Sequence, residues 1–291
     1  MAKDKYSAVW VSHTSLNDYL KCPRYYYLRN VYKDPKTGHK IQLTGPALAL
    51  GASVHEVVEA LSVLPTESRF DESLVVKFDS AWNKFSGKKG GFKDVDQEHQ
   101  YKERGKAMLR RIMDRPGPLA NKAVKINQDL PYYWISEEDN IILCGKIDWL
   151  EYLPESDSVN IIDFKTGKNK EEKSSLQLPI YLLLVGNCQK RTVSKASYWY
   201  LETDNIPTQV ELPETGEAEK QILRIAREIK LAKKLNKFTC PEGEDGCVFC
   251  RPFESILKGE GEYVGENDYH QDIYILPAKE ISEEILDSFI L

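Results

Sequence analysis

The chain is predicted to fold as an α/β domain, in which helices flank a central mixed β-sheet and a helical insertion precedes the central hairpin. Within residues 141–168, two β-branched, apolar runs flank a short turn of Pro, Ser and Asp residues, which is typical of a hairpin. Helical patterns occur on both sides of this hairpin, and a polar, helix-rich stretch of about residues 65–120 comes before it. This order of elements indicates a mixed α/β core.

The composition is that of an ordinary globular protein, with 41% hydrophobic and 29% charged residues in a chain of 291 residues. This length suits one large domain or two small ones. No apolar run reaches the length that spans a bilayer, and the first residues lack the apolar segment of a signal peptide. We therefore expect a cytoplasmic protein that makes no membrane contact.

The net charge of −5 argues against a uniformly basic nucleic-acid-binding protein. It still allows a local basic surface beside an acidic metal site. The chain also contains six cysteines, which a reducing compartment would keep from forming a disulfide framework. Clustered thiols in such a compartment indicate a metal or iron–sulfur site, and isolated thiols indicate packing.

The N-terminal third is predicted to be helical. A first helix is expected to begin with Ser15 as its N-cap, and a second helical run covers residues 24–29. A strongly helical, apolar segment then runs over residues 46–64. His55 and Glu59 lie four residues apart in this segment and so share one face of the helix.

Two helical stretches carry runs of basic residues, one in the insertion and one near residues 216–236. Such runs suit a phosphate backbone, although each is equally typical of a solvated face paired with local acids. The candidate DNA-binding residues are Lys102, Arg104, Arg110 and Arg111 in the first stretch, and Arg227, Lys230 and Lys234 in the second.

The two runs of the hairpin each contain one acid where an apolar residue is expected, Asp148 in the first and Asp163 in the second. Lys165 follows two residues after Asp163, so the period of a strand places both side chains on one face. Charged residues at inward positions are costly unless they pair or bind a metal. Two interpretations are open. The two acids and the lysine form an oxygen-rich site for Mg²⁺ or Mn²⁺, or the acids lie on edge strands and one of them pairs with Lys165.

The hairpin is followed by an apolar helix over residues 177–185, with a proline in its first turn. Gln177 and Tyr181 are four residues apart and share one face of that helix. Further short strands are predicted on both sides of the hairpin, at residues 124–126, 131–135, 195–202 and 208–212.

A cysteine-rich segment closes the informative part of the chain. Cys247 and Cys250 form a C-x2-C pair, and Cys240 lies seven residues upstream of it, which is typical of a metal or cluster site. Cys22 is a natural fourth ligand if the N-terminal helix packs near this segment. Residues 259–291 are acidic and punctuated by glycines, and we interpret them as a C-terminal extension without an assigned role.

Several ordered blocks of the chain resemble the PD-(D/E)XK nuclease superfamily, and specifically its RecB-like exonuclease branch. That branch includes the CRISPR-associated RecB-like exonucleases and the AddB nuclease domain. The blocks are S-L-N-D-Y-L-K-C-P-R-Y-Y-Y, G-A-S-V-H-E-V-V-E, G-K-I-D, I-I-D-F-K-T-G-K, Q-L-P-I-Y and the cysteine-rich end. The resemblance implies a restriction-endonuclease-like core that occupies residues 1–258.

The resemblance also implies roles for single residues. The metal ligands would be His55, Asp148, Asp163 and the backbone carbonyl of Phe164. Lys165 would orient or activate the attacking water and stabilise the pentavalent phosphate. Gln177 and Tyr181 would steady the lysine, the water or the DNA strand. This assignment fits the chemistry, because a hard divalent cation lowers the pKa of a bound water and stabilises charge on the phosphoryl oxygens.

The cysteines follow the resembling family only in part. Its iron–sulfur members carry one cysteine near the N-terminus and a C-x2-C-x5-C pattern near the C-terminus. Cys22, Cys247 and Cys250 match these positions, whereas the last position is Ile256 and Cys240 lies upstream. The four thiols suit a [4Fe–4S] cluster or a zinc ion with altered loop geometry, and the alternative is reduced thiols without a metal.

The sequence therefore predicts a metal-dependent deoxyribonuclease, acting as an exonuclease on single-stranded or resected DNA ends in recombination, repair or replication. Its expected partners are DNA and proteins of such a complex. One alternative is a catalytically silent DNA-binding or complex-assembly module of the same fold. Another is an endonuclease or a CRISPR spacer-processing nuclease, because end selection does not depend on the catalytic residues.

Overall fold

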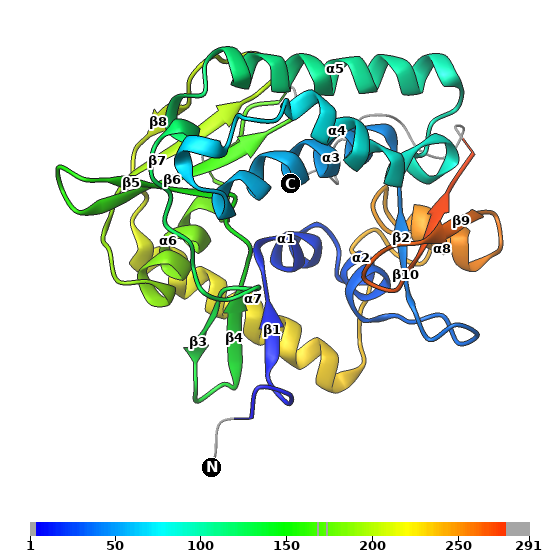
Figure 1. Cartoon of the computed structure of the whole chain (residues 1–291). Helices are drawn as coiled ribbons and strands as arrows, with labels where there is room; N and C mark the ends of the chain where they lie inside the picture. The colour runs from blue at the N-terminus through cyan, green and yellow to red at the C-terminus, as the bar shows by residue number, and fades with distance from the viewer. Residues whose placement is uncertain (1–3, 168, 173, 278–291) are drawn as a thin grey trace.

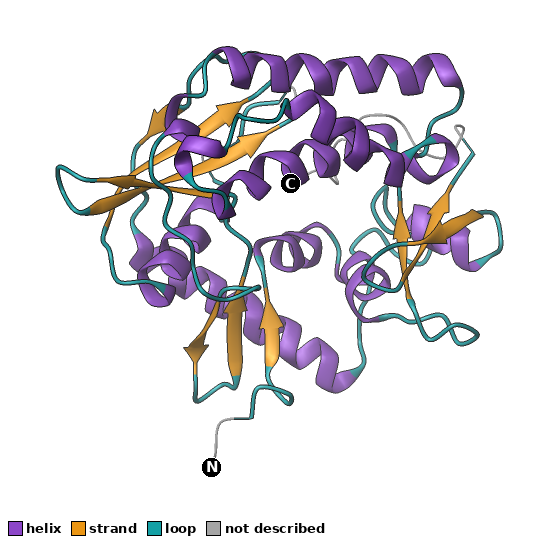
Figure 2. Ribbon diagram, in the orientation of Figure 1, coloured by secondary structure: helices purple, strands orange, loops and turns teal. Residues whose placement is uncertain are grey.

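The computed structural model describes residues 4–167, 169–172 and 174–277 (Figure 1). Its strands form three sheets, one with four strands and two with three strands. Figure 2 shows helices above and below the four-stranded sheet, with one three-stranded sheet at the bottom of the view and the other at the right. The predicted α/β class is confirmed.

The four-stranded sheet has the order β5-β6-β7-β8. Strands β5 and β6 form the predicted antiparallel hairpin, β6 and β7 are parallel, and β8 adds an antiparallel edge. All eight residues of β6 are buried, which agrees with its central place. The four strands are β5 (Trp149–Leu153), β6 (Ser158–Lys165), β7 (Val193–Tyr200) and β8 (Thr208–Val210).

This sheet separates two hydrophobic cores. Ile161 of β6 belongs to the core beneath α6 (Gln177–Cys188) and α7 (Thr215–Leu235), whereas Ile162 belongs to the core beneath the helical insertion. The two-residue period of a strand sends neighbouring side chains to opposite faces. The end of β6 therefore lies between two helical layers.

The first run of the predicted hairpin is interrupted. Residues Ile141–Cys144 form β4, which pairs in a separate sheet with β1 (Val9–Val11) and β3 (Tyr132–Ser136). The chain leaves β4 at Gly145, where a Cβ atom would lie 2.9 Å from the side chain of Leu184, so only glycine fits without a shift. Asp148 therefore lies immediately before β5 and not within one long strand.

The helical insertion of about residues 65–120, together with helix α3 that precedes it, covers the second face of the sheet. α3 (Pro46–Ala60), α4 (Leu74–Trp82) and α5 (Val95–Asp114) pack around a core that includes Phe78 and Trp199. The other helices described are α1 (His13–Lys21), α2 (Pro23–Tyr26), η1 (Tyr27–Val31), η2 (Leu61–Val63), η3 (Thr66–Ser68), η4 (Asn83–Phe85), η5 (Gly87–Gly90), η6 (Gly117–Ala120) and α8 (Arg251–Leu257).

The N-cap of α1 lies three residues earlier than predicted. Ser12 is the N-cap, and Ser15 occupies the third helical position. The Ser12 side chain accepts from the Ser15 N–H, and the Ser15 hydroxyl accepts from the Ser12 N–H at 2.8 Å. This reciprocal capping box satisfies two donors, which explains why the earlier serine begins the helix.

One segment reaches the length and apolar composition of a membrane span, contrary to the sequence-based expectation. It comprises residues Pro46–Val63, which form α3 and η2. Half of this segment is buried inside the protein, and α3 packs against α4 and α5. Core helices of soluble proteins share these properties, so the segment is explained by its place in the core.

Part of the predicted C-terminal extension, after residue 258, pairs with the rest of the protein. β9 (Glu262–Glu266) and β10 (Gln271–Ile275) form an antiparallel pair, and β10 is parallel to β2 (Lys40–Leu43). The buried carboxylate of Asp272 anchors β10, because it accepts from the Thr37 hydroxyl at 2.7 Å. Residues 278–291 of the predicted extension lie outside the described residues.

Candidate active site and cysteine cluster

Asp163 and Lys165 lie on one face of the last residues of β6, as their spacing predicts. Both are buried, and Lys165 Nζ lies 3.0 Å from Asp163 Oδ2. Lys165 also donates a hydrogen bond of 2.5 Å to Gln177 Oε1, at the first position of α6. The ammonium group is thus held between a strand and a helix.

Gln177 connects the acid, the lysine and Tyr181. Its amide nitrogen donates to Asp163 Oδ1 at 3.0 Å and lies 3.2 Å from the Tyr181 hydroxyl. The residues predicted to steady the lysine therefore make direct contacts in this site. Because every member of the network contacts another, the lysine has a defined position before any substrate arrives.

Glu171 completes the surroundings of Lys165 and was not among the residues predicted from the sequence. Its Oε2 lies 3.0 Å from Lys165 Nζ. Burial lowers the pKa of Lys165, but Asp163 and Glu171 together raise it above its usual value. The side chain remains an ammonium ion at neutral pH, so it can stabilise negative charge but cannot accept a proton.

A second group of ligand atoms forms where α3 approaches β5. His55 Nδ1 lies 3.2 Å from Glu59 Oε1 and 3.6 Å from Asp148 Oδ2. The ligand atoms of these three residues all lie within 4.8 Å of one another. Lys146 forms an ion pair with the other oxygen of Glu59. Glu59, which the sequence placed only near His55, is therefore a full member of the group.

Asp148 joins this group to the end of β6. It accepts a hydrogen bond of 2.9 Å from the Phe164 backbone N–H. Burial raises the pKa of Asp148 to about 7, although the nearby His55 opposes the shift. Burial lowers the pKa of His55, but Asp148 and Glu59 outweigh it and raise the pKa to about 9. The site strongly favours a positive charge among its acids.

The donor set fits a hard divalent cation. The buried Asp163 Oδ2 has no hydrogen-bond donor among the described residues, although the Lys165 ammonium lies near it. Carboxylate oxygens with free lone pairs are the ligands that Mg²⁺ and Mn²⁺ take in proteins, and the His55 imidazole lies beside them. His55, Glu59 and Asp148 would hold such an ion, with Asp163 as the adjoining acid. The ligand role of the Phe164 carbonyl stays a prediction.

A large cavity opens onto this second group. It has a volume of about 1370 Å³, and His55, Glu59 and Asp148 line it. Four lysines line the same cavity, Lys84, Lys89, Lys125 and Lys146. These four lysines lie outside the two basic helical stretches from which the candidate DNA-binding residues were selected.

The predicted DNA-binding residues of α5 contact protein groups instead. Arg104 pairs with Glu202 at 2.8 Å, and Lys102 pairs with Asp79 at 2.9 Å. Arg111 donates to the backbone carbonyl of Leu201. Arg110 lies 3.6 Å from a carboxylate oxygen of Glu103. These contacts tie α5 to its neighbours, and they support the alternative of a paired helix face.

The candidates on α7 have a similar environment. Arg227 pairs with Asp139 at 2.7 Å, and Lys230 donates to the backbone carbonyl of the same residue. Lys234 is exposed. Contact of these residues with DNA stays a prediction.

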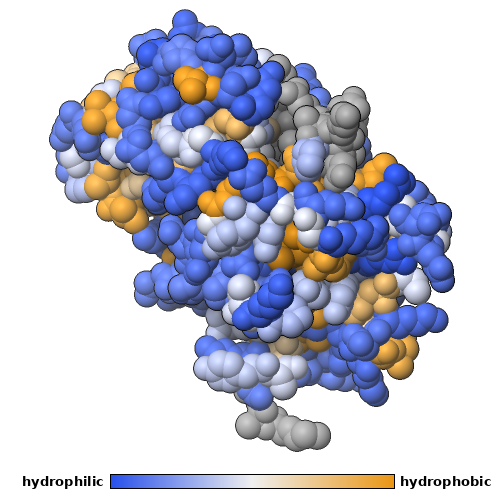
Figure 3. Space-filling model, turned by 90° about the vertical axis from the view of Figure 1, so that its right-hand side faces the viewer, coloured by the Kyte–Doolittle hydropathy of each residue, from blue (hydrophilic) through white to orange (hydrophobic). Residues whose placement is uncertain are grey.

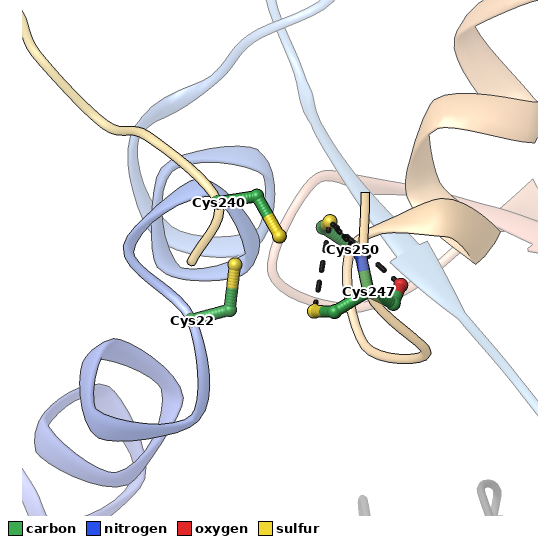
Figure 4. A group of neighbouring side chains, drawn as sticks. All are labelled: Cys22, Cys240, Cys247 and Cys250. Atoms are coloured by element: carbon green, nitrogen blue, oxygen red, sulfur yellow. Dashed lines mark hydrogen bonds between the residues drawn. The ribbon is translucent and has the colours of Figure 1, made fainter. Parts of the chain in front are cut away.

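The four predicted cysteines of the metal or cluster site converge. Figure 4 shows the side chains of Cys22, Cys240, Cys247 and Cys250 pointing toward a common centre. All four are buried, and their sulfur atoms lie within 4.8 Å of one another. Cys22 stands between α1 and α2, so the site joins the N-terminal helices to the loop that follows α7.

The four thiols lie close together in the protein interior. Cys250 Sγ accepts from the Cys247 backbone N–H at 3.2 Å and lies 3.7 Å from Cys247 Sγ. Burial, with a smaller effect of Cys247, raises the pKa of Cys22 to about 12. Four soft sulfur donors in one buried place fit a thiolate-bound metal, which would deprotonate them.

The family model that describes the PD-(D/E)XK nuclease superfamily matches residues 10–255. The chain belongs to this superfamily. Its members are nucleases that use divalent metals and act on DNA, which agrees with the acidic site at the end of β6. The RecB-like branch within the superfamily stays a prediction. Among curated proteins, none is similar enough in sequence to be matched to this chain.

Proposed function

We propose that this protein is a metal-dependent DNA exonuclease that acts on single-stranded or resected ends. The observation that carries the proposal is the buried network of Asp163, Lys165 and Gln177 beside the group of His55 and Asp148. The network supplies acids that can bind a metal ion and a lysine that can stabilise the phosphate, which are the groups that phosphodiester hydrolysis needs. A degenerate, non-catalytic relative would be free to lose these contacts.

The residues divide the reaction between them. The acids would hold a divalent cation, which would act as a Lewis acid and lower the pKa of a bound water. Lys165 stays charged and stabilises the pentavalent phosphate. Gln177 keeps both Lys165 and Asp163 in place, so that neither side chain must reorganise during the reaction.

Two features support a preference for DNA ends. One is the resemblance of the ordered motifs to the RecB-like exonuclease branch. The other is the helical insertion, which packs over the sheet next to the site and contributes Lys84, Phe85 and Lys89 to the lining of the cavity. A role in repair, recombination or replication, with protein partners of such a complex, follows from the same resemblance.

Linear single-stranded DNA labelled at one end is expected to be degraded in Mg²⁺ or Mn²⁺, whereas closed single-stranded circles remain intact. A chain end is needed because an exonuclease starts there. The measurement is a product ladder from protein purified without oxygen, with Lys165→Ala as the inactive control. Cleavage of circles would identify an endonuclease, and tight binding without cleavage would identify an assembly module.

We further propose that the four cysteines hold one zinc ion in preference to a [4Fe–4S] cluster. Four thiolates on one tetrahedral zinc lie about 3.8 Å apart, because each Zn–S bond is about 2.3 Å. Cys247 and Cys250 have their sulfurs 3.7 Å apart, and all four sulfurs lie within 4.8 Å of one another. In a cubane cluster each thiolate binds a different iron, which separates the sulfurs further.

Purified protein is expected to be colourless and to contain about one zinc per chain. Elemental analysis of anaerobically prepared protein measures this directly, and Cys188→Ser, which changes a thiol outside the cluster, is the matched control. A brown sample containing iron and acid-labile sulfide would refute the zinc assignment and support the cluster.

A further inference from the structure

The turn between β9 and β10 brings an exposed tyrosine to the cavity at the candidate metal site. Tyr269 lines the same cavity as His55, Glu59 and Asp148, and 83% of its surface is exposed. The family match ends at residue 255, so this turn lies beyond the part of the chain that the superfamily accounts for. The catalytic network does not explain why an aromatic side chain stands there.

The turn that carries Tyr269 is held firmly. The side chain of Asn267 accepts from the backbone N–H groups of Tyr269 and Gln271, both at 3.0 Å. The same side chain donates to Gln42 of β2 at 2.7 Å. His270 has a φ of 55°, a left-handed conformation that closes the turn. The backbone of Tyr269 is therefore positioned before any ligand binds.

Both lysines and acids line the cavity around the tyrosine. Lys84 pairs with Glu56 at 2.8 Å and lies 4.0 Å from Asp268 of the same turn, and Lys146 pairs with Glu59. Lys89 and Lys125 line the same cavity, are exposed, and make no ion pair within the described part of the chain. These two lysines are therefore available to phosphate groups. Figure 3, which views the molecule from the side of the β2-β10-β9 sheet, shows a mainly hydrophilic face with scattered apolar areas.

An exposed aromatic ring on a rigid turn beside lysines is the arrangement that binds single-stranded nucleic acid. The ring offers a stacking surface to an unpaired base, and the lysines attract the phosphates on either side. A base inside a duplex is already stacked, so the ring gains little from it. The contact therefore selects for unpaired DNA.

We propose that Tyr269 is a substrate-positioning residue, which stacks on a base of the incoming single strand and directs the neighbouring phosphate toward His55 and Asp148. This proposal rests on the proposed function, because it assumes a DNA substrate. It assigns the strand preference to the β9–β10 turn and not to the basic residues of α5 or α7.

The test is an affinity measurement in the Lys165→Ala background, so that the strand is not cleaved. Tyr269→Ala is expected to weaken binding of oligothymidylate about 10-fold, which corresponds to about 1.4 kcal/mol, because it removes the stacking surface. Tyr269→Phe keeps the ring and should keep the affinity. Tyr6→Ala removes an equally exposed tyrosine elsewhere and should change nothing.

An oligonucleotide of the same length without bases distinguishes stacking from a general effect. Tyr269→Ala and the parent protein should bind this abasic strand equally. Equal losses on normal and abasic strands, or an unchanged affinity of Tyr269→Ala for oligothymidylate, would overturn the proposal. Because binding is read without cleavage, this outcome is separate from a failure of the nuclease assignment, which appears only as absent cleavage by the wild type.

Discussion

Replacing Asp163 with asparagine is expected to lower the rate of DNA cleavage by about 10³-fold, a loss of about 4 kcal/mol of transition-state stabilisation. One oxygen of the carboxylate accepts a hydrogen bond from the Gln177 amide, and the other lies 3.0 Å from the Lys165 ammonium. Asparagine removes the negative charge that a metal needs. It also turns an amide donor toward the Lys165 ammonium, which disfavours the position of both groups.

Single-turnover cleavage of end-labelled DNA at saturating Mg²⁺ measures this effect, and the melting temperature checks that the fold is kept. Asp157→Asn is the matched control. Asp157 is an exposed acid in the turn of the same hairpin, and its ion pair with Arg191 lies on the protein surface. Its φ of 44° is one that asparagine tolerates. Near-normal cleavage by Asp163→Asn would exclude this residue from the catalytic group.

The parts of the site that the sequence predicted correctly depend on short-range geometry. Asp163 and Lys165 share a face because a strand has a period of two residues. Gln177 and Tyr181 share a face because a helix repeats every 3.6 residues. Such relations follow from local structure alone, so they do not depend on how distant segments pack.

The parts that the sequence could not predict depend on contacts between distant segments. Glu171 stands in a run of charged residues, and nothing in that run distinguishes it from a solvated acid. The break after β4 arises because that strand pairs with β1, which lies far upstream. β10 likewise pairs with β2, so the C-terminal segment becomes part of the cavity wall.

The basic runs illustrate the same limit. Arg104 pairs with Glu202, which lies 98 residues away in the chain, and Arg227 pairs with Asp139, which lies 88 residues away. A charge pattern reveals such a residue but not its distant partner. The structure brings the Cys22 sulfur within 4.8 Å of the other three sulfurs, as the sequence predicted on condition that the N-terminal helix packs near the C-terminal segment.

Replacing Cys22 with serine is expected to abolish metal binding at the cysteine cluster and to lower the melting temperature by about 10 °C, since metal affinity contributes directly to folding. The substitution isolates this effect. Cys22 also caps α2, where its sulfur accepts from the Tyr25 N–H, and serine is a good residue for that position. The loss will therefore report on the metal site and not on the helix start.

Thermal unfolding with and without a chelator measures this contribution, beside Cys188→Ser, which changes a thiol outside the cluster. Chelated wild type should melt like Cys22→Ser, whereas Cys188→Ser should melt like untreated protein. Arg24 still pairs with Glu254 at 2.9 Å, so the two chain segments keep one link without the metal. We therefore expect a less stable but folded protein, and equal melting of Cys22→Ser and wild type would show that the cysteines bind no structural metal.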